Sequence, residues 1–292
     1  MKVLMIKLGA TGDVVRTTPL LRRLKGEVTW LTAAKNRCLV DGIAPNVTYY
    51  PWEERESVRK WKYDLIISLE DEVQIGAFIN SLNYERIFGA ALNPDTGEMR
   101  YSEDSRQWFD LSLISVHGRE EADRLKLFNR RTYQEMIFEG LGLRFEGEEY
   151  LLPPASATGL HGDVAIAPVA GPVWPMKAWA YYQELQRELE NKGFIVNVLP
   201  TRASLLEHLA DVQGHRCLVS GDSLPMHLAL GSGVPCVSTF NCTSPWEIYD
   251  YGIQVKLISP LLAQHFYQRA FDPAATRGIS LDTVLDAVLK IV

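Results

Sequence analysis

Residues 217–245 read CLVSGDSLPMHLALGSGVPCVSTFNCTSP and predict strand, turn, helix, turn, strand and loop in that order. The apolar run Cys217 to Val219 is short enough to be a buried strand, and Ser220 to Ser223 have the composition of a turn. Pro225 suits the first position of a helix whose apolar residues continue to Leu230. The glycines at positions 231 and 233 then favour the end of this helix.

A turn of this kind at the carboxyl end of a strand predicts an anion-binding site. The first N–H groups of a helix have no partner within the helix, and the helix dipole places positive charge at the same end. Open α/β sheets bind their ligands just beyond the carboxyl ends of their strands. Because phosphate is the anion most often bound in such places, the stretch indicates an α/β fold that binds a phosphorylated ligand.

The N-terminal residues predict a second strand, turn and helix. Lys2 to Leu8 form a β-like run, Gly9-Ala10-Thr11-Gly12-Asp13 form a turn, and Val14 to Lys25 carry apolar residues at helical spacing. No Gly-Lys-Ser/Thr follows, so the turn is not a Walker A loop, and its two glycines fall short of the GxGxxG fingerprint. Spacing alone leaves two interpretations of Asp13: an acid that stabilises the first helical turn by about 0.3–1 kcal/mol, or a catalytic group.

The second half of the chain opens with a similar pattern. Asp163 to Ala167 predict a strand, Pro168 to Gly171 a turn, and Lys177-Ala178-Trp179 the approach to a further helix. A lysine at the start of a helix is electrostatically unfavourable unless an anion is bound there. Lys177 is therefore either a surface lysine or an anion-binding group.

These stretches together resemble the signatures of one known family. Asp222 to Ala229 (DSLPMHLA), Gly233-Val234-Pro235 and Thr243-Ser244-Pro245 resemble the D-[ST]-G-P-M-H-[LI]-A, G-x-P and F-G-P-T-x-P motifs of the ADP-heptose:lipopolysaccharide heptosyltransferases, glycosyltransferase family 9. The N-terminal Asp13-Val14-Val15 with the following TTPLL resembles that family's G-D-[VI]-[VLI]-x-[TS]-x-P motif, and Lys177-Ala178-Trp179 resembles its K-x-W block.

The resemblance implies a GT-B architecture, with two Rossmann-like α/β domains of parallel strands facing across a cleft. It implies an inverting, metal-independent transfer of a sugar, heptose in that family, from an ADP-sugar to a hydroxyl, with no separate cofactor. Asp13 would be the catalytic base. The turn at the cleft would comprise Gly9, Thr11 and Gly12, and the donor would contact Lys177, Asp222, Ser223, Leu224 and His227.

The sequence departs from the family motif at two places. Leu224 stands where the family has glycine, and Asn241-Cys242 stand where it has Gly-Pro. Glycine allows a backbone to approach a diphosphate closely, and leucine does not. His227 also has two interpretations, a donor contact or a satisfied structural histidine, because it lies on the first turn of the predicted helix.

Length and composition set the domain organisation. A chain of 292 residues with 47% hydrophobic and 23% charged residues predicts a soluble globular protein of two domains. We expect an acceptor-side domain over residues 1–150 and a donor-side domain over 160–292, with the linker between Arg144 and Gly162. The net charge of −6 argues against nonspecific nucleic-acid binding.

The remaining features concern the compartment. The four cysteines, at positions 38, 217, 236 and 242, lack CxxC spacing, which favours inert thiols in a reducing compartment over a zinc ribbon or a redox pair. No apolar run reaches about 18 residues and the chain begins directly with a strand, which predicts neither a membrane span nor a signal peptide. We expect a cytoplasmic protein, with peripheral contact at the inner face of the membrane as an alternative.

Two charged segments have ordinary interpretations beside functional ones. Glu70-Asp71-Glu72 contains alternating acids, as in a metal-binding DxD site, but is more typical of a charged loop at a strand end. Tyr101 to Leu143 have helical composition, and their basic residues suit either a solvated, ion-paired surface or a landing site for an anionic acceptor. These basic residues are Arg119, Arg124, Lys126, Arg130 and Arg131.

The sequence therefore predicts a glycosyltransferase that uses a nucleotide-sugar donor and a glycan or lipid-linked glycan acceptor. Two other classes stay open. One is a GT-B-fold sugar-nucleotide epimerase, which would bind the same donor without a second sugar. The other is a sugar-nucleotide binding protein without catalytic activity, which the leucine at position 224 keeps open.

Overall fold

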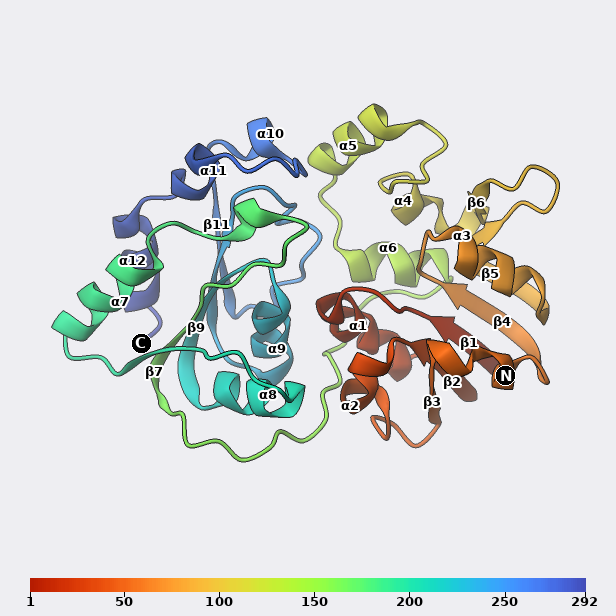
Figure 1. Ribbon diagram of the computed structural model, residues 1–292, viewed down its shortest axis with the longest axis horizontal. Helices are drawn as coiled ribbons and strands as arrows, with labels where there is room; N and C mark the ends of the chain where they lie inside the picture. Colours follow the sequence, from red (N-terminus) through yellow and green to blue (C-terminus); the bar gives the residue numbers. More distant parts are fainter. The chain divides into compact units, whose positions relative to one another are not determined.

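The computed structural model describes all 292 residues and divides them into two compact units, Met1–Pro153 and Pro154–Val292. Each unit is built on its own β-sheet, and helices cover the sheet faces (Figure 1). Every strand pair is parallel except the last one of the first sheet. The predicted class, α/β with two parallel sheets, is confirmed.

The first unit has a six-stranded sheet in the order β3-β2-β1-β4-β5-β6. The strand predicted from Lys2 to Leu8 is present and ends two residues earlier, at Ile6, and a short antiparallel strand, β6, lies at one edge of the sheet. The strands are β1 (Lys2–Ile6), β2 (Glu27–Thr32), β3 (Val47–Pro51), β4 (Lys62–Ser68), β5 (Asn83–Leu92) and β6 (Met99–Tyr101). The helices are α1 (Thr11–Thr17), α2 (Arg37–Val40), α3 (Val73–Asn80), α4 (Arg106–Phe109), α5 (Arg119–Phe128) and α6 (Tyr133–Gly140).

Strand β1 lies in the middle of this sheet and is buried on both faces. Its residues from Val3 to Ile6 are wholly inaccessible to solvent, as the continuous apolar run in the sequence predicts for a central parallel strand. Leu4 and Ile6 pack into a core with Ile75 and Phe78 of α3. A strand held in this way gives the turn after it a fixed starting point.

Two local expectations for this unit are wrong. The predicted five-residue turn after β1 is shorter, because α1 already begins at Thr11 and includes Gly12 and Asp13. The same helix ends at Thr17, where a 3-10 segment from Thr18 to Arg22 continues the chain. Pro19 accounts for the change, because a proline lacks the N–H that a continued α-helix would need.

The region from residue 101 to 143 is three separate helices instead of one helical block. Gly118 precedes α5 with a φ of 80°, a left-handed conformation that favours glycine and cannot continue a helix. Helix α6 starts afresh with a capping box, in which Thr132 and Glu135 each accept a hydrogen bond from the other's backbone N–H.

The second unit has a five-stranded parallel sheet in the order β11-β10-β9-β7-β8. Its strands are β7 (Gly162–Ala167), β8 (Val196–Val198), β9 (His215–Gly221), β10 (Cys236–Phe240) and β11 (Gln254–Ile258). Its helices are α7 (Tyr182–Asn191), α8 (Leu205–Gln213), α9 (Leu224–Ser232), α10 (Leu262–His265), α11 (Pro273–Arg277) and α12 (Leu281–Leu289).

Helices α7 and α12 cover one face of this sheet, while α8 and α9 are drawn on the opposite face (Figure 1). The core under α7 and α12 includes Leu185, Leu189 and Val288. The indole Nε1 of Trp179 donates to the Ile279 carbonyl oxygen at 2.8 Å, which ties the start of α7 to the end of the chain. Ser280 caps α12, because its hydroxyl accepts from the Thr283 N–H.

Helix α9 begins at Leu224, one residue before the predicted first position at Pro225, and it also ends later than predicted. It continues through the predicted stop at Gly231 to Ser232, and Gly233, with a φ of 70°, terminates it in the left-handed conformation. No helix of the structure combines the length and the apolar character that crossing a membrane requires.

Both sheets reverse their strand order at one point. In the first unit the chain moves outward from β1 to β3 and then returns to place β4 on the other side of β1. In the second unit it moves from β7 to β8 and then returns to place β9 on the other side of β7. Open α/β sheets bind ligands at the carboxyl ends of the strands that flank such a reversal. The residues that follow β1, β4, β7 and β9 are therefore the first place to look for a site.

Candidate functional site

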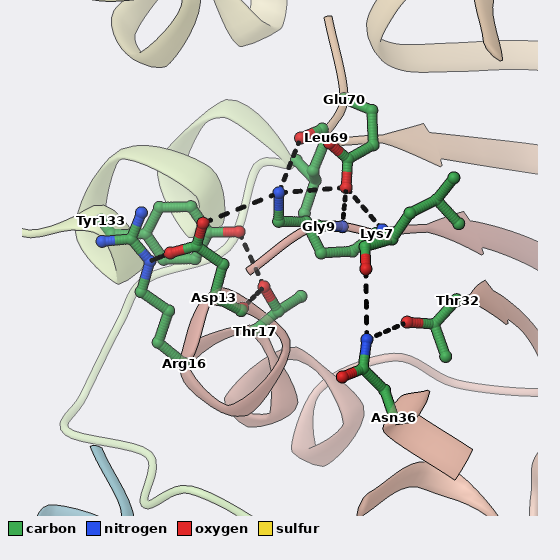
Figure 2. Close-up of polar contacts among 11 residues, drawn as sticks. Lys7, Gly9, Asp13, Arg16, Thr17, Thr32, Asn36, Leu69, Glu70 and Tyr133 are labelled. Carbon is green, nitrogen blue, oxygen red and sulfur yellow. Dashed lines mark hydrogen bonds and ion pairs between the residues drawn. The ribbon is translucent and has the colours of Figure 1, made fainter. Parts of the chain in front are cut away.

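Asp13, the predicted base, lies in the first turn of α1, just after β1. Its carboxylate lies between two cations: Oδ1 is 3.0 Å from Arg16 Nε, and Oδ2 is 3.9 Å from Lys7 Nζ (Figure 2). The side chain is 30% exposed, so the carboxylate remains open to an incoming group. The predicted position of Asp13 at the start of a helix is confirmed. The sequence did not predict the two cations beside it.

Lys7 is the first of these cations, and it is buried immediately after the last residue of β1. Its ammonium group lies 3.1 Å from Glu70 Oε1 in addition to its contact with Asp13. Burial by itself would lower the pKa of Lys7, but Asp13, Glu70 and Tyr133 outweigh it and hold this pKa above its ordinary value. Lys7 is therefore a permanent positive charge beside Asp13.

Glu70 is a further charged residue of this group and follows β4, the strand beside β1. Its Oε1 accepts hydrogen bonds from Lys7 Nζ at 3.1 Å, Leu8 N at 2.5 Å and Gly9 N at 2.9 Å (Figure 2). The side chain is buried. The expectation that residues 70 to 72 form an ordinary charged loop is thus wrong for Glu70, which turns inward and holds the turn that leads to Asp13.

A second set of hydrogen bonds holds the other side of the same turn. Buried Asn36 donates from Nδ2 to the Leu8 carbonyl oxygen at 3.1 Å and to Thr32 Oγ1 at 3.0 Å. Its Oδ1 accepts from Thr11 Oγ1 at 2.9 Å. Among the three residues predicted for this turn, Gly9 and Thr11 are thus fixed by side chains from other elements, and Gly12 lies within α1.

Arg16, the second cation beside Asp13, is held against aromatic rings. Its guanidinium carbon is 4.3 Å from the ring centre of Tyr133 and 5.4 Å from that of Trp108. Such cation–π contacts fix a long side chain that would otherwise sample many rotamers. Burial raises the pKa of Tyr133 although Arg16 and Lys7 oppose it, so its hydroxyl is neutral. That hydroxyl lies 2.8 Å from Thr17 Oγ1, which ties α6 to α1.

We call Lys7, Asp13, Arg16, Glu70 and Tyr133 the Asp13 cluster. The more distant basic residues of α5 and its surroundings do not belong to it, and several are paired locally. Arg119 contacts Asp123 at 2.7 Å, Arg124 contacts Glu121 at 2.6 Å, and Arg131 pairs with Glu139. For these three arginines the predicted ion-paired surface is confirmed.

In the second unit, Lys177 and Asp222 meet at the predicted anion-binding turn. Lys177 ends a 3-10 segment after β7, and Asp222 follows β9, the strand beside it. Their Nζ and Oδ2 atoms are 2.9 Å apart, and both side chains are largely buried. The backbone permits this because a Cβ on Gly221 would lie 2.4 Å from the Lys177 carbonyl oxygen.

Asp222 is held ionised in this pair. Burial would raise the pKa of Asp222, but Lys177, His227 and Thr243 outweigh burial and lower this pKa to about 2. His227 is itself buried on the first turn of α9, close enough to Asp222 to contribute to this shift. Lys177, Asp222 and His227 therefore come together as predicted.

The N-terminus of α9 has no side-chain cap. Ser223 is the N-cap residue in an extended conformation, but its hydroxyl donates to the Gly221 carbonyl oxygen at 3.3 Å and does not cap the helix. Leu224 is the first helical residue and is half-buried. A nine-residue helix without a side-chain cap retains N–H groups and a positive dipole end for an anion.

The segment after β10 contacts the backbone next to Lys177. Asn241, one of the residues that departs from the family motif, donates from Nδ2 to the carbonyl oxygen of Ala178 at 3.2 Å. The Asn241 Oδ1 and Ser244 Oγ atoms are buried without a hydrogen-bond partner. The departure at Asn241 thus has a structural role, because it fixes the residue next to Lys177.

Sequence reasoning missed Lys7, Arg16, Glu70, Tyr133 and Asn36. Two of them left a signal: Lys7 is a charged residue at the end of an apolar strand, and Glu70 follows such a strand directly. A charge at this position in a parallel sheet points to the ligand edge. Arg16 and Tyr133 left none, since their contact depends on how α6 packs against α1.

The whole chain resembles several solved structures in fold. The E. coli heptosyltransferase WaaC with ADP matches with a TM-score of 0.64 and 15% identity over 100% of both chains. A family 9 glycosyl transferase from Veillonella parvula matches with a TM-score of 0.65 and 15% identity, over 99% of this chain and 95% of the other.

The E. coli ADP-heptose LPS heptosyltransferase II matches similarly, with a TM-score of 0.59 and 16% identity over 100% of this chain and 98% of the other. No protein-family model matches the sequence, and a search of curated proteins finds no match. The resemblance to glycosyltransferase family 9 is confirmed for the fold along the whole chain.

Acid titration tests the Lys177–Asp222 pair. The pKa of Asp222 is lower in the folded protein, about 2, than its ordinary value of 3.8, so the folded state binds this proton less readily. The pair should stabilise the protein by roughly 2 kcal/mol above about pH 4, and the contribution should fade as the pH falls towards 2. We expect Asp222→Asn to lower the free energy of unfolding at pH 7 and to differ much less from the parent at pH 2. Urea unfolding at both pH values measures this, and an equal difference at both would show that Asp222 is not held ionised by Lys177.

Proposed function

We propose that the protein is an inverting, metal-independent glycosyltransferase that moves a sugar from an ADP-sugar to a hydroxyl group. The observation that carries the proposal is the placement of Asp13 and of the Lys177–Asp222 pair at the strand-order reversals of two parallel sheets. The same full-length fold occurs in structures described with ADP and with ADP-2-deoxy-2-fluoro heptose. Heptose is accordingly the first sugar to test.

The second unit would bind the donor diphosphate. Lys177 supplies a positive charge, and the uncapped start of α9 supplies N–H groups and the positive end of a helix dipole. When the sugar leaves, negative charge develops on the diphosphate, and these groups stabilise it where it forms. Asp222 would hold the Lys177 ammonium group in place through their ion pair, and His227 would lie beside the same anion.

The first unit would supply the base. The acceptor hydroxyl oxygen attacks the anomeric carbon of the sugar, and the bond from that carbon to the diphosphate oxygen breaks. The electron pair of this bond leaves with ADP, and the hydroxyl proton goes to the Asp13 carboxylate. Attack from the face opposite the leaving group inverts the anomeric configuration. The partial exposure of Asp13 suits contact with an incoming hydroxyl.

No acidic pair suited to a bridging metal enters this scheme. The one buried acid of the Glu70-Asp71-Glu72 segment has its Oε1 engaged by Lys7 and two backbone N–H groups. The charge on the leaving diphosphate would instead be met by Lys177 and α9. The proposal therefore predicts activity in the presence of a chelator.

The wider assignment follows the same proposal. Residues 1–150 would form the acceptor side and residues 160–292 the donor side, with a glycan or lipid-linked glycan as acceptor. Lipopolysaccharide biosynthesis in the cytoplasm, at the inner face of the membrane, is the setting that this chemistry suits. A sugar-nucleotide epimerase and a sugar-nucleotide binding protein without catalytic activity are the alternatives, and transfer assays separate them from the proposed function.

The donor is tested by thermal unfolding with nucleotides. We expect ADP or an ADP-sugar to stabilise the protein in excess chelator, by about 2.7 kcal/mol at a concentration of 100 times Kd. Lys177→Ala should remove most of this stabilisation, because the diphosphate loses its cation. Lys192→Ala, which changes an exposed lysine of the same unit, should leave it unchanged. Stabilisation that disappears with the divalent ions would contradict metal independence, and an undiminished shift in Lys177→Ala would place the diphosphate elsewhere.

The base is tested by Asp13→Asn. The substitution keeps the size of the side chain and an oxygen that can accept from Arg16, and Glu70 still pairs with Lys7, so stability should fall by about 1 kcal/mol. Transfer from ADP-heptose should fall by about 10² to 10⁴, the usual contribution of a positioned base. ADP affinity and melting temperature, measured on the same preparation, should stay near the parent values. Transfer at close to the parental rate would leave Asp13 with a helix-stabilising role alone.

The departure at position 224 is tested by Leu224→Gly. A glycine at the first residue of α9 removes a half-buried side chain beside the proposed diphosphate site and allows closer backbone approach. We expect tighter ADP-sugar binding or a broader choice of donor, measured by calorimetry with several nucleotide sugars. Weaker binding of every donor would instead mean that the leucine forms part of a reshaped pocket for a different donor.

A further inference from the structure

Glu70 is a buried carboxylate that the proposed reaction does not use directly. The Glu70 side chain is 8% exposed, and a buried glutamate almost always has a charged partner, which here is Lys7. Its Oε1 accepts three hydrogen bonds, from Lys7 Nζ and from the backbone N–H groups of Leu8 and Gly9. Glu70 Oε1 thus contacts both Lys7, the cation beside Asp13, and the β1–α1 turn that precedes Asp13.

Figure 2 shows how the charges alternate. Lys7 Nζ lies between Glu70 Oε1, at 3.1 Å, and Asp13 Oδ2, at 3.9 Å, while Arg16 Nε contacts the other oxygen of Asp13 at 3.0 Å. Tyr133 is the remaining titratable side chain of the cluster, and its hydroxyl is neutral. The charges of the four ionised side chains, two positive and two negative, cancel.

The balance changes when Asp13 accepts a proton. Two cations beside a carboxylate favour its ionised form and make it a poor base. Once Asp13 is neutral, Lys7 and Arg16 face a single remaining carboxylate, that of Glu70. Without the Glu70 charge, the protonated state would leave two cations in a largely buried site with no counter-charge, which low dielectric makes unfavourable.

We propose that Glu70 is a positioning residue for the catalytic base: its charge offsets that of Lys7, so that Asp13 can accept the acceptor proton, and its Oε1 fixes the β1–α1 turn. This inference rests on the proposed function, since it assigns a partner to the same base. It is separate from the role of Asp13 itself, because Glu70 acts through Lys7 and does not touch the reacting atoms.

The alternative is that Glu70 only fixes the β1–α1 turn, through its hydrogen bonds from Leu8 N and Gly9 N. Glu70→Gln separates the two roles, because a glutamine Oε1 can still accept from Leu8 N, Gly9 N and Lys7 Nζ and only the charge is lost. Were the role purely structural, this variant would behave like the parent in both rate and pH dependence.

The experiment is the pH dependence of kcat/KM for sugar transfer in the parent and in Glu70→Gln. We expect the rate at its plateau to fall about tenfold or more, as befits a weakened base. Because loss of a negative charge disfavours protonation of Asp13, its pKa should fall, and the acid limb of the profile should move to lower pH by about one unit. An unchanged profile with an unchanged plateau rate would overturn the proposal.

A direct reading of Asp13 does not depend on activity. The carboxyl carbon-13 signal of Asp13, assigned by its loss in Asp13→Asn, should titrate at lower pH in Glu70→Gln than in the parent. If the parent transfers no sugar but this shift is present, the proposed function fails and the role of Glu70 stands. If transfer occurs and the Asp13 signal does not move, the proposed function stands and the role of Glu70 is refuted.

Two further variants serve as controls. Glu148→Gln removes a carboxylate of the same unit that also accepts from an arginine and a backbone N–H, and it should change neither the profile nor the Asp13 titration. The double variant Lys7→Gln/Glu70→Gln removes both charges of the pair, so the Asp13 titration should return towards that of the parent. A double variant whose Asp13 still titrates like that of Glu70→Gln would contradict a role exerted through Lys7. Circular dichroism and a cooperative thermal unfolding transition, measured for every variant, confirm that each is folded.

Discussion

Parallel pairing of strands is the constraint on which both groups of functional residues depend. Ile6 of β1 pairs with Ser68 of β4, so the residues that follow these two strands emerge at the same level of the same sheet edge. Lys7 and Glu70 therefore meet although 63 positions separate them in the sequence. In the second unit β7 and β9 pair in the same way and bring Lys177 to Asp222.

This pairing places charged side chains in largely buried positions. A charge taken out of water is costly unless a partner of opposite sign and hydrogen bonds replace the solvent. Each site meets that condition with its own pairs, Lys7 with Glu70 and Lys177 with Asp222. In each case a lysine and a carboxylate lie together at the carboxyl end of a strand, where open α/β sheets bind ligands.

Much of the fold could be predicted because its signals are local. The buried parallel strands are continuous apolar runs, and the turns after β1 and β9 carry glycine, serine and aspartate at fixed offsets. The same local patterns left Asp13 and Lys177 with two interpretations each, and the resemblance to a family motif singled out these two residues and Asp222. The contacts of Glu70, Arg16 and Tyr133 were not predicted, because strand register and helix packing create them and neither is written in a short stretch of sequence. The boundary of α1 was misjudged because the 3-10 segment around Pro19 keeps the apolar spacing of a helix.

The departures from the family motif differ in how the structure accommodates them. Asn241 uses its side-chain amide to hold the Ala178 carbonyl, so the residue beside Lys177 is fixed by a hydrogen bond that the Gly-Pro of the motif could not make with a side chain. Gly221, by contrast, matters for the side chain that it lacks, because the Lys177 backbone passes where a Cβ would lie. Leu224 differs from both, because its side chain is apolar and cannot make a hydrogen bond like that of Asn241, and it has a Cβ where Gly221 has none. It is the first residue of α9 and is half-buried, so its side chain adds apolar volume at the start of a helix that has no side-chain cap.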